Sequence, residues 1–119
     1  MLNLIYIFVG GGFGCLARYA VSKFLLTTGE ASFPWATLVS NVLSVIVMGV
    51  ALGLFSAKLQ SESLRLLIIT GFCGGFSTFS TFSLETLELF RRGNYMFAAG
   101  NVALSLVLCL IVLAVLIRK

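Results

Sequence analysis

Histidine is absent from this sequence, proline occurs once, and charged residues are scarce. Without histidine, the chain lacks the commonest metal ligand and the usual proton shuttle at neutral pH. Only 10% of the 119 residues are charged, whereas a soluble domain has about 25%. No pair of carboxylates and no nucleophile beside a base stands out in the sequence. These deficits predict that the chain is not an enzyme and has no soluble domain.

Apolar residues dominate what is present. They make up 60% of the chain, and the mean hydropathy is +1.12. A membrane-spanning helix needs roughly 20 apolar residues, so this length accommodates four. We predict an all-α membrane protein, a single integral-membrane domain over residues 1–119 with four transmembrane helices. Their expected ranges are about 2–26, 34–57, 64–90 and 95–117.

The net charge of +4 does not indicate nucleic-acid binding, because the eight basic residues are scattered among the expected helix ends. They divide equally between the two sides of the membrane: Lys58, Arg65, Arg118 and Lys119 lie on the side of the termini, and Arg18, Lys23, Arg91 and Arg92 on the other. Orientation follows the bias of lysine and arginine, and here the bias is nil. This predicts insertion in both orientations, which permits an antiparallel homodimer. Alternatively, one charge or the lipid decides the orientation.

The third expected helix contains an unusual mixture of glycine, hydroxyl and phenylalanine residues in the range 71–83. In hydrocarbon, irregular or polar backbone is tolerated only where it is buried in protein or lines a cavity. Gly74 and Gly75 are expected to break the helix in mid-membrane and to free carbonyls that can hold a cation such as Na⁺. Phe79 and Phe82, three residues apart, share a face, and their positive ring edges suit a small anion. Alternatively, these rings face lipid.

Polar residues on the other helices are also aligned. Thr37, Asn41 and Ser44 share one face of the second helix, where the Asn41 amide either serves as a donor to an anion or bonds to a neighbouring helix. Arg18 either draws anions toward a vestibule or snorkels to the interface. Glu85, late in the third helix, is read mainly as an interfacial ion-pair residue.

The fourth helix carries a polar stripe of Asn101, Ser105 and Cys109. The stripe either continues a path of hydroxyls that includes Ser80 and Thr81 of the third helix, or it only holds helices together. In the second case, the hydroxyls of the third helix bond back to carbonyls of their own helix.

Residues 71–83 resemble the GxCGGxTTFSTFS signature of the fluoride channel family known as Fluc or CrcB. The glycine cluster and arginine of residues 10–19, and residues 37–41 followed by Gly49, are further points of similarity. The family pattern usually has glycine where this chain has Ala36 and Ser44, and threonine at Ser77.

The resemblance implies a dual-topology antiparallel dimer with two fluoride pores, in the inner (plasma) membrane. The second subunit would be another copy of this chain or a paired paralogue. Asn41, Phe79, Phe82, Ser80, Thr81 and Ser105 would line the pore, and Arg18 would lie in its vestibule. A structural Na⁺ at the dimer interface would be held by the backbone carbonyls of Gly74 and Ser77 from both subunits.

We therefore predict a passive, fluoride-selective channel that exports F⁻ and lowers fluoride toxicity in the cytoplasm. One alternative is a small four-helix, dual-topology exporter of drugs or cations. Such exporters use a carboxylate embedded in the membrane, and the nearest candidate here, Glu85, lies late in its helix. The other alternative is a non-conducting membrane assembly subunit.

Overall fold

The computed structural model describes residues 1–26, 33–54 and 61–118, and every regular element in this part of the chain is helical. The elements are α1 (Leu2–Leu26), α2 (Trp35–Leu54), α3 (Glu62–Arg65), the π-helix η2 (Leu66–Cys73), α4 (Gly74–Phe76), α5 (Phe79–Arg91) and α6 (Tyr95–Leu116). They form four segments long and apolar enough to cross a membrane: Leu2–Leu25, Trp35–Gly53, Glu62–Arg91 and Tyr95–Leu116. The prediction of four transmembrane helices is confirmed. Positions 55–57 of the expected second helix, together with Lys58 and Lys119 of the charge comparison, lie outside the described residues.

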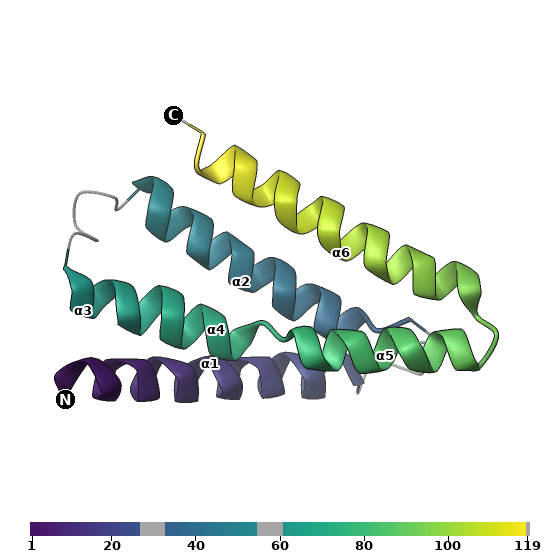
Figure 1. Cartoon of the computed structure of the whole chain (residues 1–119), viewed down its shortest axis with the longest axis horizontal. Helices are drawn as coiled ribbons and strands as arrows, with labels where there is room; N and C mark the ends of the chain where they lie inside the picture. Colours follow the sequence, from purple (N-terminus) through teal and green to yellow (C-terminus); the bar gives the residue numbers. More distant parts are fainter. Residues whose placement is uncertain (27–32, 55–60, 119) are drawn as a thin grey trace.

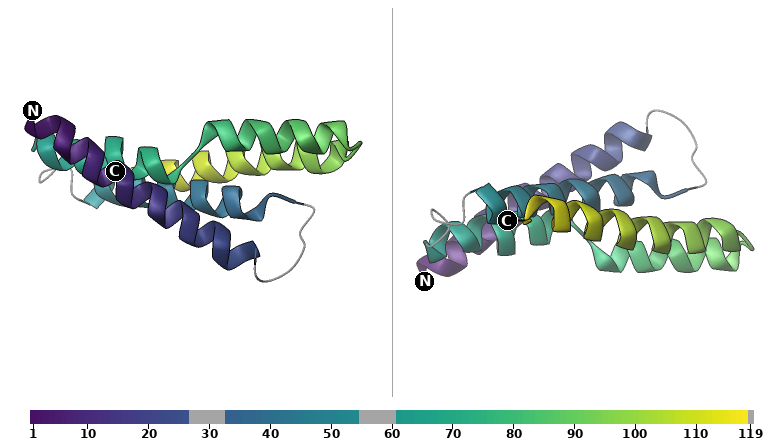
Figure 2. Two further views of the ribbon diagram at one scale, coloured as in Figure 1. Left: turned by 90° about the horizontal axis from the view of Figure 1, so that it is seen from below. Right: turned by 90° about the horizontal axis from the view of Figure 1, so that it is seen from above.

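Successive spans run in opposite directions, so both ends of the chain lie toward the same end of the bundle (Figure 1). The first half of the third span, formed by α3, η2 and α4, packs along α1. The second half, α5, lies beside α6 instead, as the two views of Figure 2 also show. Helix α2 contacts α1, η2 and α6. The third span therefore changes partners midway along its length.

This change of partners coincides with a break in the helix (Figure 1). Ser77 (φ −83°, ψ 154°) and Thr78 (φ −149°, ψ 122°) are extended, and they separate α4 from α5. The prediction of a broken third helix is confirmed, but its expected position at Gly74 and Gly75 is wrong. Both glycines lie within α4, and the backbone leaves the helix only after Phe76. The hydrogen bonds made by Asn41 and Thr78, described below, explain why the break lies after Phe76 and not at the two glycines.

The glycines instead allow close packing of α1 against the third span. A Cβ on Gly10 would collide with the carbonyl oxygen of Leu67 and lie 3.1 Å from the Cα of Gly71. A Cβ on Gly14 would collide with the carbonyl oxygen of Phe72. Small residues let membrane helices approach to this distance. The packing interpretation of the glycine cluster therefore holds for these two positions.

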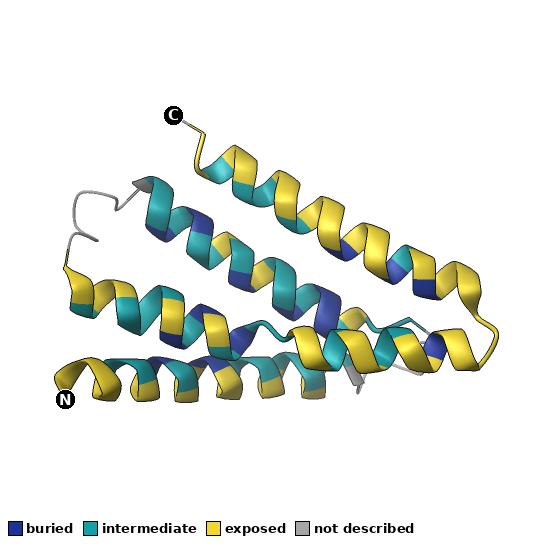
Figure 3. Ribbon diagram, in the orientation of Figure 1, coloured by how far each residue is buried: buried dark blue, intermediate teal, exposed yellow. Residues whose placement is uncertain are grey.

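The few buried residues lie where the helices face one another (Figure 3), and they include polar as well as apolar side chains, whereas the exposed surface carries many large apolar ones. Ser40 and Asn101 are fully buried, and Ser44 is 1% exposed. Large apolar side chains, such as Phe8 and Leu110, lie on the outside. This is the reverse of a water-soluble domain, and it suits a protein whose surroundings are hydrocarbon.

We expect replacement of Gly10 by alanine to destabilise the fold by about 1–3 kcal/mol, because the new methyl group would overpack the contact of α1 with the third span. Gly11→Ala is the matched control, since its Cβ would meet its nearest neighbour, the Gly71 carbonyl oxygen, at an ordinary 3.8 Å. Thermal unfolding in detergent, followed by size-exclusion chromatography, measures the difference. Equal melting temperatures for the two variants would contradict the packing described here.

Candidate functional site

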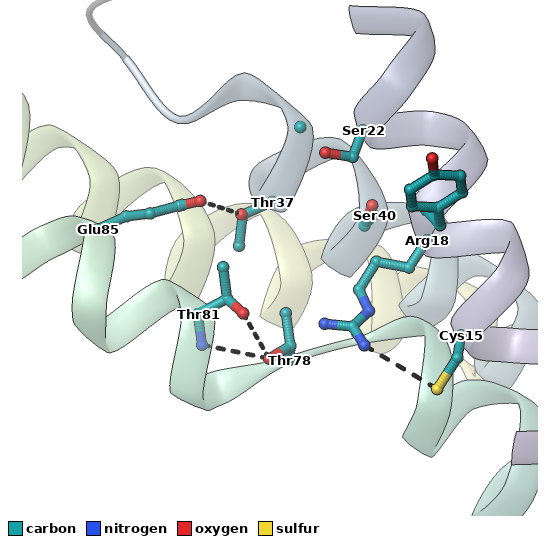
Figure 4. A pocket seen from close by; sticks show the side chains of 10 residues that line it. Cys15, Arg18, Ser22, Thr37, Ser40, Thr78, Thr81 and Glu85 are labelled. Carbon is teal, nitrogen blue, oxygen red and sulfur yellow. Dashed lines mark hydrogen bonds between the residues drawn. The ribbon is translucent and has the colours of Figure 1, made fainter. Parts of the chain in front are cut away.

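A pocket of about 280 Å³ opens between α1, α2 and α5 (Figure 4). The side chains in its lining that carry polar atoms are Cys15, Arg18, Tyr19, Ser22, Thr37, Ser40, Thr78, Thr81 and Glu85. They include one cation, one carboxylic acid and six hydroxyls. Such a lining is polar and can exchange hydrogen bonds with a small hydrophilic solute.

Glu85 and Arg18 approach the pocket from different helices (Figure 4). The Thr37 hydroxyl donates a hydrogen bond of 2.8 Å to Oε1 of Glu85. In the described part of the chain, Oε2 of Glu85, Nε of Arg18 and Oγ of the fully buried Ser40 have no hydrogen-bond partner. All three atoms are buried in the single chain, and a buried polar atom normally has a hydrogen-bond partner, so each is a group that a bound solute, water or a second subunit would satisfy.

The expectation that Glu85 acts mainly in an interfacial ion pair is wrong, because Glu85 is half-buried in this pocket and bonded to Thr37. The sequence spacing indicates this position, because Thr78, Thr81 and Glu85 follow one another at i, i+3 and i+7. That spacing places the three side chains on the same face of a helix.

Asn41 of α2 reaches the break in the third span. Its Oδ1 accepts a hydrogen bond of 3.0 Å from the backbone N–H of Thr78. In a continuous helix this N–H would instead bond to the carbonyl of Gly74. Asn41 thus satisfies the backbone where the helix is interrupted. Because its oxygen is engaged, its NH₂ group is the part left to donate to another acceptor.

The hydroxyl of Thr78 caps the N-terminus of α5. Its Oγ1 accepts from the Thr81 backbone N–H at 3.2 Å, and it also lies 3.3 Å from Thr81 Oγ1 and 3.2 Å from Ser80 Oγ. The predicted residues Ser80 and Thr81 therefore belong to a cluster of hydroxyls. The cluster lies at a helix N-terminus, where the partial positive charge of the backbone favours anions.

Phe79 and Phe82 lie on one side of α5, and their ring centroids are 5.7 Å apart with an interplanar angle of 36°. The expected shared face is confirmed. Phe79 is 79% exposed in the single chain, whereas Phe82 is half-buried. The Phe79 ring is thus free to face lipid or a second subunit.

Not all predicted site residues converge. Of the seven side chains assigned to pore and vestibule, only Arg18 and Thr81 line the pocket. Asn41, Ser80 and Phe79 lie at or beside the break. Ser105 is buried on α6, and its Oγ has no hydrogen-bond partner among the described residues.

The two carbonyls proposed for Na⁺ both lose their usual helical donors. Thr78 gives its N–H to Asn41 rather than to the Gly74 carbonyl, and Thr81 gives its N–H to the Thr78 hydroxyl rather than to the Ser77 carbonyl. In the described part of the chain, no group of three or more His, Cys, Asp or Glu side chains could hold a metal ion. Released carbonyls are hard oxygen ligands, so they fit a cation such as Na⁺.

Four membrane-spanning helices, a break in the third, and amide, hydroxyl and aromatic groups around that break define an integral membrane protein of the transport class. The chain belongs to the CrcB family, since the model described as "CrcB-like protein, Camphor Resistance (CrcB)" matches residues 5–117. The resemblance noted in the sequence is confirmed.

Curated relatives support this membership. The chain is 42% identical to the protein named Fluoride-specific ion channel FluC of Shewanella loihica, over 92% of this chain and 89% of that protein. It is 40% identical to the protein of the same name from Methylocella silvestris, over 92% and 86%, respectively. For the one from Rhizobium johnstonii, the identity is 41%, and the alignment covers 98% of this chain and 97% of the relative.

Proposed function

We propose that this protein is a fluoride-specific ion channel that lets F⁻ leave the cell passively. The observation that carries the proposal is the similarity to proteins named as fluoride channels, at 40–42% identity over nearly the whole chain. The relatives are channels, so the prediction that the chain is not an enzyme is confirmed. The four spans make it a multi-pass membrane protein. Its location in the inner (plasma) membrane is part of this proposal, since a channel that lets F⁻ leave the cytoplasm would act there.

The physical task is to replace the water around a small anion. Moving such an ion into a medium of low dielectric costs on the order of 20 kcal/mol by the Born estimate. The pore must therefore offer donors to F⁻, yet hold it weakly enough for it to leave again. Uncharged dipoles meet both conditions better than a lysine or arginine would.

The NH₂ group of Asn41 is the donor that we place first in the path. Its orientation is fixed because Oδ1 accepts from the Thr78 backbone. The hydroxyls of Ser80 and Thr81 follow at the N-terminus of α5, with the ring edges of Phe79 and Phe82 on the same helix. Ser105 contributes a hydroxyl from α6, and Arg18 attracts anions into the vestibule.

A second subunit in antiparallel orientation completes the pore in this proposal. The highly exposed ring of Phe79 needs a cover other than water, and the equal division of basic residues permits both orientations. The partner is a second copy of this chain or a paired paralogue, and lipid surrounds the remaining apolar surface.

The carbonyls of Gly74 and Ser77, from both subunits, are the residues that would hold a structural Na⁺ at the centre of the dimer. When bound, Na⁺ supplies a fixed positive charge that ties the two breaks together. The support for this assignment is the diversion of the Thr78 and Thr81 N–H groups to other acceptors.

The proposal is tested by fluoride efflux from vesicles that contain the purified protein, measured with a fluoride electrode, with chloride efflux as the control. We expect rapid fluoride efflux and no chloride efflux. Vesicles in which the assembled protein leaves fluoride trapped would overturn the proposal and support an assembly subunit. Transport of a hydrophobic cation driven by a pH gradient, without fluoride flux, would support an exporter that uses Glu85.

The Asn41→Asp variant separates the two roles of this side chain. Aspartate retains an oxygen that can accept from Thr78, so the break should persist, but it replaces the amide donor by a charged acceptor. We expect fluoride flux to fall at least about 100-fold, because like charges about 4 Å apart repel by about 4 kcal/mol at an effective dielectric constant of 20. Unchanged flux in correctly assembled protein would show that Asn41 does not face the ion.

Removal of Na⁺ tests the carbonyl site. When N-methylglucamine replaces Na⁺ on both sides of the membrane, we expect lower fluoride flux and a lower melting temperature of the protein in detergent. A ligand at 100 times its Kd stabilises the folded state by about 2.7 kcal/mol, and this contribution would be lost. Identical melting curves in the two salts would argue against a bound Na⁺.

A further inference from the structure

A chain of hydrogen bonds runs from the polar stripe of α6 to the backbone of the pore-forming helix. Nδ2 of Asn101 donates to Oγ1 of Thr86 at 2.8 Å, and Oγ1 of Thr86 donates to the carbonyl oxygen of Phe82 at 2.7 Å. Asn101 is fully buried. This series of hydrogen bonds therefore ends at the backbone of Phe82, one of the two phenylalanines expected to touch fluoride.

Counting protons fixes the donor and the acceptor of each hydrogen bond in this series. A threonine hydroxyl has a single proton, and Thr86 uses it on the Phe82 carbonyl. Thr86 can then only accept from α6, so the NH₂ group of Asn101 must face it. This leaves Oδ1 of Asn101 without a partner in the described part of the chain. A buried amide with one end unsatisfied costs free energy, so the side chain needs a reason beyond packing.

The rotation of α5 about its own axis has to be fixed by contacts with neighbouring helices. The extended residues Ser77 and Thr78 uncouple it from the preceding half of the span, so it does not inherit a rotation from α4. Helix α5 is bonded to α2 at its N-cap through Asn41 and further along through Thr37 and Glu85, and the bond between Thr86 and Asn101 joins its second turn to α6. Figures 1 and 2 show α5 and α6 side by side.

We propose that Asn101 is a positioning residue, which sets the rotation of α5 through Thr86 and so holds the ring of Phe82 at the angle that fluoride passage requires. The inference rests on the proposed channel function and deepens it. Asn101 itself does not touch the ion. Because Phe79 lies one turn earlier on the same helix, Asn101 fixes both rings together relative to α6.

The rival explanation is that Asn101 only holds two helices together. Isosteric variants separate the two explanations. Thr86→Val leaves the buried NH₂ group of Asn101 without its acceptor, whereas in Asn101→Leu the Thr86 hydroxyl keeps its bond to the Phe82 carbonyl. The double variant replaces both polar groups by apolar ones and should restore most of the stability lost in Thr86→Val. Helix-holding alone then predicts that flux recovers together with stability. Positioning predicts that stability recovers and flux does not.

We expect fluoride efflux to fall roughly tenfold in each single variant, as the loss of one typical hydrogen bond would allow, and to stay equally low in the double variant. Thr86→Ser keeps the hydroxyl and should conduct within about twofold of the unmodified protein. Leu110→Val, a small apolar change at an exposed position on α6, is the control for substitution in that helix. Melting temperature and dimer content are measured on the same samples.

A spectroscopic measurement reports the ring itself. With 4-fluorophenylalanine incorporated at position 82 alone, we expect the ¹⁹F resonance to shift or broaden in Asn101→Leu and in the double variant, and to be unchanged in Thr86→Ser and Leu110→Val. An unchanged resonance, or flux that follows melting temperature across all variants, would overturn the positioning role. If the unmodified protein does not conduct fluoride, the channel function fails, but the resonance still tests whether Asn101 positions the ring.

Discussion

One hydrogen bond, from the backbone N–H of Thr78 to the side-chain oxygen of Asn41, organises the centre of this molecule. It gives the interrupted helix a substitute acceptor within a membrane-spanning segment, where an unmet backbone group in hydrocarbon would cost several kcal/mol. Three features follow from it. The third span can change partners from α1 to α6, the Gly74 carbonyl loses its helical donor, and the Asn41 amide presents its NH₂ group in a fixed direction.

The distribution of polarity is consistent with that arrangement. Hydroxyl and amide side chains lie between the helices, and apolar side chains cover the outside. Hydrophobic burial contributes little to the association of helices within lipid, so close glycine contacts and interhelical hydrogen bonds determine the packing. Several of the polar groups that join the helices are also those that the proposed pore would offer to an anion. An asparagine, serine or threonine in such a protein can therefore serve both in helix packing and in anion binding.

The four helices and the broken third span were predictable from the sequence, because apolar length and a cluster of glycines and hydroxyls are local signals. The position of the break was not, since it depends on an acceptor 37 residues away, on α2. Glu85 was also misjudged: charge suggested the interface, but burial against Thr37 and the pocket decided its surroundings. The bond from Asn101 to Thr86 required the contact between α5 and α6, which spacing along one helix cannot reveal.

The π-helix of residues Leu66–Cys73 has a consequence for exchanging segments between relatives. Its i→i+5 bonds wind the chain more loosely than an α-helix, and such turns often mark functional sites. Deleting or inserting one residue within this segment would rotate everything that follows about the helix axis. Gly75 would then turn away from α1, and Thr78 away from its acceptor. A chimera that combines the third spans of two relatives should therefore have its junction outside residues 66–73. This holds even where the two relatives have identical residues within that segment.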